Sequence, residues 1–415
     1  MYTADILVLG VGFTGLLVAE TLARHRERSK FIFAIAGRSQ EKLDAIVSCP
    51  PLQGIKAFRV DVSSSTELDH VVRQFRVVIN CNSKYWKLGL PVSMRVCRNP
   101  LSRSHWRTAF LPQISSMTLN EDRHQYIVVF ESTQKLREKY GADIKVSSST
   151  TAMNLHKVFV SRGTAASGIS LLQDVPRDIF WKSLEPFSLS PIQGKSSPIK
   201  LLYDLKPAVD LVGSFFLLAG NNVAAVNRTW GLLQSTGSPA AYGEDFQYTE
   251  FLVAPSSIAA RIASVVALVV ASILIYVPPI RWLVGWLVDR ESTNPRYSEL
   301  KTGSICVTNI TKSVPSASNS IPHCAKTVFK TIGGDGGYMG SAVTVSECAL
   351  LLLLHKRSEL PLSSYRGFRV LTPMAAFGSL LKKETRGLGF LRNYDGDSGL
   401  TTNSRLTATN TFCTS

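Results

Sequence analysis

The sequence predicts an α/β protein: a doubly wound parallel sheet, then a second α+β domain that carries an apolar, membrane-seeking segment. Three observations indicate this. A glycine pattern follows a short apolar run at the N-terminus, strand and helix patterns alternate over the first hundred residues, and residues 262–280 contain no charge. With 415 residues, the chain is long enough for two or three domains with sizeable cores.

The composition narrows the classes of function. The formal net charge of +16 favours anionic partners, such as phosphorylated cofactors or acidic lipid headgroups. No compact Lys/Arg run with interleaved aromatic residues is present, which argues against nucleic acid. The seven cysteines form no C-x-x-C pair and H-E-x-x-H is absent, so we expect reduced intracellular thiols and no metal site.

The first strand and the glycines after it predict a dinucleotide site. Residues 6–9 are continuously apolar, as in a strand buried on both faces of a parallel sheet. Gly10, Gly12 and Gly15 follow with G-x-G-x-x-G spacing, and residues 16–25 have helical periodicity. In this Rossmann-type context, the glycines permit a tight turn, close approach of a pyrophosphate, and close helix–strand packing, in that order.

The residues around the turn and after the second strand favour NADP(H). Phe13 and Thr14 lie at the start of the helix, whose N–H groups attract phosphate. An NAD site usually has an acidic residue at the end of the second strand, but this chain has Arg38 and Ser39 there, with Lys42 one turn later. A guanidinium suits a 2′-phosphate. The alternative is that Arg38 is a solvated loop residue.

Two further strands complete the predicted parallel sheet. Residues 55–64 alternate as a third strand, with Asp61 and Val62 at its end, where an adenine ring would lie. Residues 75–83 form a fourth, which Asn80 ends near the expected nicotinamide. Helical patterns separate these strands, as in repeated β-α-β units. Ordinary loop capping by the two polar side chains is the alternative to cofactor contact.

Several of these pieces resemble the saccharopine-dehydrogenase-like oxidoreductases, most closely the trans-acting enoyl reductase branch. G-F-T-G (12–15) and A-G-R-S (36–39) are specific in combination, and later patches at 161–168, 333–354 and 370–381 follow in order. The resemblance implies NADP(H), reduction of a carbon–carbon double bond in an acyl or polyketide-like lipid, and association with lipid surfaces. It also implies that the helix near Thr164 faces the active-site cleft, where a plain N-cap role for Thr164 is the alternative.

The chain also departs from the family pattern. The opening glycine of the family motif is replaced by Leu9, and the family's G-P-Y loop by Ser83-Lys84-Tyr85. Residues 98–132 and 295–326 do not match, which leaves true divergence and a gene-model fault both open. No catalytic acid is evident; Tyr85 is the nearest phenol, with a packing role as the stronger interpretation.

The remaining sequence predicts the domain plan. Residues 131–154 indicate a helix, a glycine stop and a strand, 163–175 a helix, and 341–356 a buried helix after a glycine-rich turn. The expected domains are 1–132 (NADP-binding, with 98–132 atypical), 133–257 (α+β), 258–290 (apolar segment), 291–390 (remainder of the second domain) and 391–415 (a polar, disordered tail).

The apolar segment favours contact with one side of a membrane. Pro278-Pro279 interrupts residues 262–280, leaving about sixteen helical residues, or roughly 24 Å at 1.5 Å per residue, against a bilayer core of about 30 Å. Trp282 and Trp286 suit an interface. A hairpin or a helix in one leaflet keeps both ends cytosolic, at the endoplasmic reticulum or a lipid droplet. A buried core helix and a true span are the alternatives.

These features predict an NADPH-dependent oxidoreductase of lipid metabolism that reduces an acyl substrate at a membrane or lipid-droplet surface. The partners expected are this small-molecule lipid or acyl substrate and the lipid surface, without nucleic acid. The alternative is a catalytically weak or inactive nucleotide-binding scaffold on a lipid surface, which the unmatched residues 98–132 favour. Chemistry on a small soluble amino acid does not explain a membrane-seeking segment.

Overall fold

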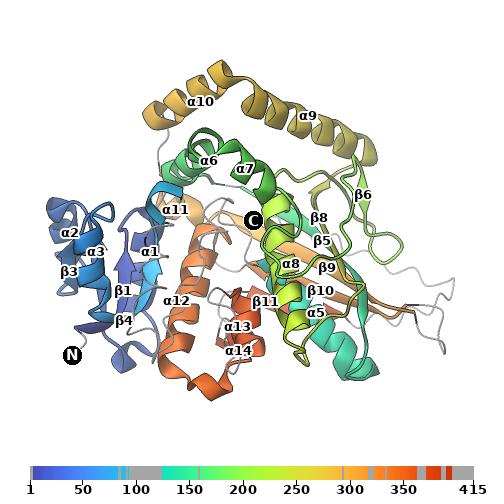
Figure 1. Cartoon of the computed structure of the whole chain (residues 1–415), viewed down its shortest axis with the longest axis horizontal. Coiled ribbons are helices and arrows are strands. Elements are labelled where there is room, and N and C mark those ends of the chain that lie inside the picture. Colours follow the sequence, from blue (N-terminus) through green and yellow to red (C-terminus); the bar gives the residue numbers. More distant parts are fainter. Residues whose placement is uncertain are drawn as a thin grey trace.

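The computed structural model describes residues 3–82, 86–89, 92, 124–157, 159–291, 294–315, 322–331, 334–361, 371–384 and 389–394. Two β-sheets form its framework, one built from the N-terminal residues and one from the rest of the chain (Figure 1). A long helix from the C-terminal part lies between them. The α/β fold with a second mixed-sheet domain is as the sequence predicts.

The N-terminal sheet is four-stranded and parallel, in the order β3-β2-β1-β4. Its strands are β1 (Ala4–Leu9), β2 (Phe33–Gly37), β3 (Lys56–Arg59) and β4 (Phe75–Asn80), and its helices are α1 (Phe13–Ala23), α2 (Gln40–Val47) and α3 (Ser65–Val72). Ser39 and Ser64 begin α2 and α3 by accepting a hydrogen bond from a backbone N–H three residues later. The predicted β-α-β series is confirmed.

Burial on both faces explains the continuous apolar sequence of β1. Ile6 and Val8 pack in one cluster with side chains of α1 and α2. Leu7 and Leu9 pack in another cluster with Leu68 and other side chains of α3. Because successive side chains of a strand point to opposite faces, a strand covered by helices on both sides has no solvent face to occupy with polar residues.

The second sheet is mixed and seven-stranded, in the order β11-β10-β9-β5-β8-β7-β6. Its strands are β5 (Val146–His156), β6 (Tyr203–Asp204), β7 (Val212–Ser214), β8 (Gln247–Ala254), β9 (Ser304–Ser313), β10 (Cys324–Thr331) and β11 (Gly389–Tyr394). Only β5 and β8 pair in parallel among the described strands of this sheet. β9 falls within residues 295–326, which do not match the family pattern, yet it is a central strand.

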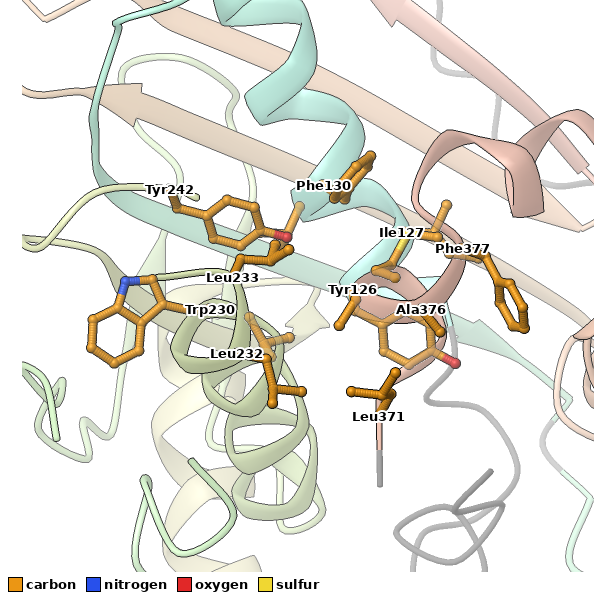
Figure 2. Close-up of a cluster of buried hydrophobic side chains, with 14 of the residues drawn as sticks. Tyr126, Ile127, Phe130, Trp230, Leu232, Leu233, Tyr242, Leu371, Ala376 and Phe377 are labelled. Carbon is orange, nitrogen blue, oxygen red and sulfur yellow. The ribbon is translucent and has the colours of Figure 1, made fainter. Parts of the chain in front are cut away.

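Helices pack on this sheet and form the apolar core of the second domain with it. α5 (His124–Tyr140) lies on β9 and β10. Figure 2 shows side chains of α5, α8 (Ala219–Ser235) and α13 (Pro373–Phe377) meeting in one apolar cluster, with Phe130, Trp230 and Phe377 among them. α14 (Ser379–Glu384) follows α13 and contacts it, and the short helix α11 (Tyr297–Leu300) precedes β9. α5 begins before the predicted boundary at 132, and β11 extends past the predicted start of the tail at 391, where Leu391 pairs with Phe329.

A polar seam separates α5 from the sheet. Buried Asn309 accepts hydrogen bonds from Ser132 and Thr311, both at 2.8 Å. Its amide donates to Ser149 at 2.8 Å and Thr151 at 2.9 Å. These groups satisfy one another, so burial costs little. The seam explains why the strand V-S-S-S-T-T-A-M-N is rich in hydroxyl residues although it is central.

α12 (Tyr338–Leu354) joins the two halves. It packs against α1 and β4 of the N-terminal sheet, and its Cys348 and Leu351 reach the core of the second domain. His25 Nε2 lies 3.1 Å from Glu347 Oε1, with both side chains at most 8% exposed. The buried helix predicted at 341–356 after the glycine-rich turn is confirmed.

The apolar segment forms two surface helices. α9 (Ser257–Tyr276) and α10 (Pro278–Glu291) follow each other across the outer side of the second domain, with α10 above α6 (Arg162–Asp174); α7 (Arg177–Ser183) follows α6 (Figure 1). Within the described residues, α9 is the single helix long and apolar enough to cross a membrane, and 11% of its most apolar 18-residue window is buried. The alternative that the apolar segment 262–280 is a buried core helix is therefore wrong in the described structure. The chain bends at Val277, and Arg281 caps the last carbonyls of α9.

Candidate functional site

The turn between β1 and α1 requires glycine at two of its three positions. Gly10 has φ +97°, in the left-handed region that favours glycine. A Cβ at Gly10 would also lie 2.9 Å from Asn82 Oδ1, and one at Gly15 would overlap the carbonyl oxygen of Gly10. These two glycines therefore set a close packing of helix on strand.

Gly12 differs, because neither its backbone conformation nor its neighbours in the protein require a glycine there. A Cβ built there meets nothing within 4 Å, and its φ of −73° suits any residue. Gly12 is the N-cap of α1 and provides no side-chain hydrogen bond to the first N–H groups of the helix, those around Phe13 and Thr14. The open face and the uncapped helix start fit a pyrophosphate, which would approach the backbone here.

Arg38 lies in the place expected for recognition of the 2′-phosphate. It is exposed directly after β2, whose end pairs with the end of β1. Ser39 accepts the backbone N–H of Lys42 at 3.3 Å and keeps its hydroxyl hydrogen for another acceptor. Lys42 is exposed one turn into α2. Among the described residues the Arg38 guanidinium has no hydrogen-bonded or ion-paired partner, so it can meet a phosphate without losing one.

The polar residues after β3 and β4 make the hydrogen bonds of loop capping. Asp61 Oδ1 accepts from the amide (2.9 Å) and hydroxyl (2.7 Å) of Ser63. These bonds, with the nearby charges of Arg38 and Arg59, lower the pKa of the Asp61 carboxyl. Asn80 donates to the carbonyl of Gly89 and accepts from Asn82. Cofactor contact by Asp61 and Asn80 stays a prediction.

The side chain of Val62 is buried in the N-terminal domain. Its side chain is 6% exposed and belongs to the apolar cluster around α3. Any contact with a cofactor would therefore be made by its backbone. Tyr85, the phenol noted in the sequence, lies outside the described residues.

Tyr338 connects the cofactor turn to the second domain. Its ring packs edge-on against Phe13, with 5.1 Å between centroids and 75° between planes. Its hydroxyl accepts the Ser161 N–H at 2.6 Å and lies 2.8 Å from Thr164 Oγ1. Ser161, and not Thr164, is the N-cap of α6, because its side chain accepts the Thr164 N–H. The start of α6 is thereby held against the G-F-T-G turn.

Asp335 fixes the position of Tyr338. The carboxylate is 4% exposed and accepts the Tyr338 N–H at 2.5 Å, as well as the N–H groups of Gly337 and Met339. Burial raises the pKa of this carboxyl despite these bonds. The sequence singled out both the glycine-rich segment and the start of α6, but gave no signal that they touch.

The glycine turn and the arginine after β2 are features of a known type of nucleotide-binding domain. Residues 6–100 match the family model of the saccharopine dehydrogenase NADP-binding domain. The N-terminal part of the chain is therefore an NADP-binding domain of the saccharopine dehydrogenase type. The match confirms the expected NADP(H) cofactor of this oxidoreductase and the resemblance drawn from its motifs.

Relatives extend the similarity beyond the first domain. A Mycobacterium tuberculosis protein, provisionally named a trans-acting enoyl reductase, is 26% identical over 93% of this chain and 96% of its own length. The saccharopine dehydrogenase-like oxidoreductase of Mus musculus is 32% identical over 23% of this chain and 26% of its own. Apo saccharopine dehydrogenase (L-Glu forming) from Saccharomyces cerevisiae covers 94% of this chain and 99% of its own, at 16% identity and a TM-score of 0.42.

Proposed function

We propose that this oxidoreductase uses NADPH to reduce a carbon–carbon double bond in a lipid or polyketide-like acyl substrate at a membrane or lipid-droplet surface. The observation that carries the proposal is the contact of Phe13 with Tyr338, which joins the NADP-type turn to α6, directly beneath the exposed apolar helix α10. The mycobacterial relative, similar over nearly its full length, supports enoyl reduction as the reaction.

Different residues bind the cofactor and position the second domain in such a reaction. Bound NADPH supplies the hydride. The turn at Gly12 and the start of α1 bind the pyrophosphate, and Arg38 binds the 2′-phosphate. Tyr338 and Thr164 position the start of α6 relative to the cofactor, which sets the geometry between hydride donor and acceptor. No described side chain is assigned as the catalytic acid.

A stripe along α9 supports docking on a lipid surface. Its apolar side chains recur at helical spacing and are at least one third exposed: Ile258, Ile262, Val265, Val266, Val269, Ile273 and Tyr276. Contiguous exposed apolar surface of this kind marks an interaction site. Trp282 and Trp286 of α10 are also exposed, as for rings at a membrane interface. Because the two helices lie along one side of the second domain, docking through them leaves the nucleotide-binding domain on the cytosolic side of the proposed surface.

The basic character of the chain suits this surface. The formal net charge of +16 attracts acidic headgroups. Docking would place the second domain, and with it the start of α6, next to a source of acyl chains. A water-insoluble substrate could then reach the cofactor without crossing bulk water.

A turnover assay tests the reaction. Purified full-length protein is mixed with NADPH and an enoyl thioester, with and without lipid vesicles, and both NADPH oxidation and the saturated product are measured. Product formation, increased by vesicles, supports the proposal. NADPH binding without any turnover across enoyl thioesters of short and long chain would favour the scaffold instead.

A further inference from the structure

A polar cavity lies where α10 crosses α6. Its volume is about 270 Å³, slightly below the ~300 Å³ at which small-molecule sites begin. It is lined by residues of three segments: residue 87, α6 and α10. The polar lining includes Lys87, Ser170, Gln173 and Asp174, and the aromatic lining is Trp282 and Trp286.

Lys87 and Asp174, the two charged residues that line this cavity, form an ion pair that a ligand can displace. Lys87 Nζ lies 2.8 Å from Asp174 Oδ1, and their side chains are 56% and 22% exposed. Ser170 donates to the other carboxylate oxygen at 2.5 Å. A partly exposed ion pair contributes little to stability, so a ligand that offers one opposite charge to each partner can replace it at little cost.

The aromatic lining indicates a cation on the ligand. An indole face attracts a desolvated cation, and aromatic residues beside a carboxylate are the usual means of holding a quaternary ammonium. Trp286 already has the Arg290 guanidinium 5.1 Å from its ring centroid. Trp282, which is 67% exposed, makes no ring contact with a cation among the described residues and is available to a ligand.

We propose that this cavity binds the phosphocholine headgroup of a membrane lipid, with the phosphate at Lys87, the trimethylammonium at Asp174 and Trp282, and the acyl chains along the apolar face of α9 and α10. The inference rests on the proposed lipid surface but not on the proposed reaction. A headgroup with only a negative charge would leave its charge facing Asp174, so the cavity selects zwitterionic over anionic lipid.

The test uses soluble short-chain lipids and the full-length protein. Dihexanoylphosphatidylcholine and dihexanoylphosphatidylglycerol are titrated below their micellar concentrations by calorimetry. Saturable binding of the choline lipid, about tenfold tighter than the glycerol lipid, is expected. Equal affinity for the two lipids, or no saturable binding of the choline lipid, would overturn the inference.

Three variants locate the site. Gly285→Leu places a larger side chain in the lining of the cavity, where a Cβ already lies 3.1 Å from Ile169 and 3.2 Å from Gln173. It should weaken binding of the choline lipid about tenfold. Trp282→Ala, at an exposed position, should also weaken it. Trp181→Ala is the matched control, since Trp181 is exposed on α7 and packs beside α9 but does not line the cavity. Equal effects at Trp181 and Trp282, or none at Gly285, would contradict the assignment.

The outcomes separate this inference from the proposed reaction. Choline-lipid binding without NADPH-dependent turnover of enoyl thioesters would end the proposed reaction and support the cavity assignment. Turnover without selective lipid binding would do the reverse.

Discussion

The hydroxyl of Tyr338 lies 2.8 Å from Oγ1 of Thr164, although 174 positions separate the two residues in the chain. The ring of Tyr338 also packs edge-on against Phe13 in the cofactor turn. A single buried side chain thus touches the predicted NADP site and the helix that leads to the apolar surface. We infer that Tyr338 positions α6 with respect to the NADP site.

Replacing Tyr338 by Phe tests that role. The ring contact with Phe13 is kept, but the Ser161 N–H loses its acceptor, which costs about 1–3 kcal/mol of stability. We expect kcat to fall and NADPH affinity to stay near that of the wild type, as measured by steady-state kinetics and NADPH titration. Tyr297→Phe, at an exposed position, is the control. A rise in the KM for NADPH that matches the fall in kcat would show that the hydroxyl serves the cofactor itself.

Two glycine variants separate cofactor binding from folding. Gly12→Ala meets open space, so the melting temperature should hardly change, but its methyl group would lie on the pyrophosphate face and weaken NADPH by about tenfold or more. Gly15→Ala should lower the melting temperature strongly, because its Cβ would overlap a backbone carbonyl. Differential scanning fluorimetry with and without NADPH measures both. Unchanged NADPH affinity in Gly12→Ala would contradict the assignment of this turn.

Glutamate substitutions in the apolar stripe of α9 test whether it binds a lipid surface. The double variant Ile262→Glu, Val266→Glu changes two side chains that are 60% and 55% exposed, so the fold should be kept. We expect it to remain at the bottom of a sucrose gradient when the wild type floats with vesicles. Ile199→Glu is the control, because Ile199 is 68% exposed elsewhere on the second domain. Flotation of the double variant would show that α9 does not make the contact.

Asp335 gives a pH dependence with a defined sign. Burial raises its pKa above the ordinary 3.8, so the folded state holds the proton more tightly than the unfolded state. Its contribution to the free energy of unfolding is therefore fully present below pH ~4 and is lost as the pH rises through the folded-state pKa. Urea unfolding of the wild type and Asp335→Asn across this range should show the wild type losing stability relative to the variant. The opposite trend would mean that the three backbone N–H donors outweigh burial.

The N-terminal domain could be predicted from sequence because its signals are local. The apolar run of β1, the glycine spacing and the serine caps of α2 and α3 all lie within a few residues of the elements that they define. The predicted segments 6–9, 75–83 and 163–175 differ from β1, β4 and α6 by up to three residues at their ends. Such differences reflect capping and strand-end pairing, which single-sequence periodicity does not resolve.

The joined site could not be predicted, because it depends on contacts between distant segments. Nothing in the glycine-rich turn indicates that Tyr338 meets both Phe13 and Thr164. Val62 was expected beside a cofactor, but it faces the core because its position in the loop after β3 turns it inward. The apolar sequence of α9 fits a core helix and a surface helix equally, and only the packing of the second domain distinguishes them.

The most direct measurement of the central claim is the affinity of Arg38→Ala for NADPH and for NADH. Loss of the guanidinium should weaken NADPH by about 1–3 kcal/mol, because a charged hydrogen-bond partner of the 2′-phosphate is removed. NADH, which lacks that phosphate, should bind as to the wild type. Arg24→Ala, at the opposite end of α1, should change neither affinity. Equal weakening of NADPH and NADH by Arg38→Ala, or no weakening of either, would contradict the NADP site described for this domain.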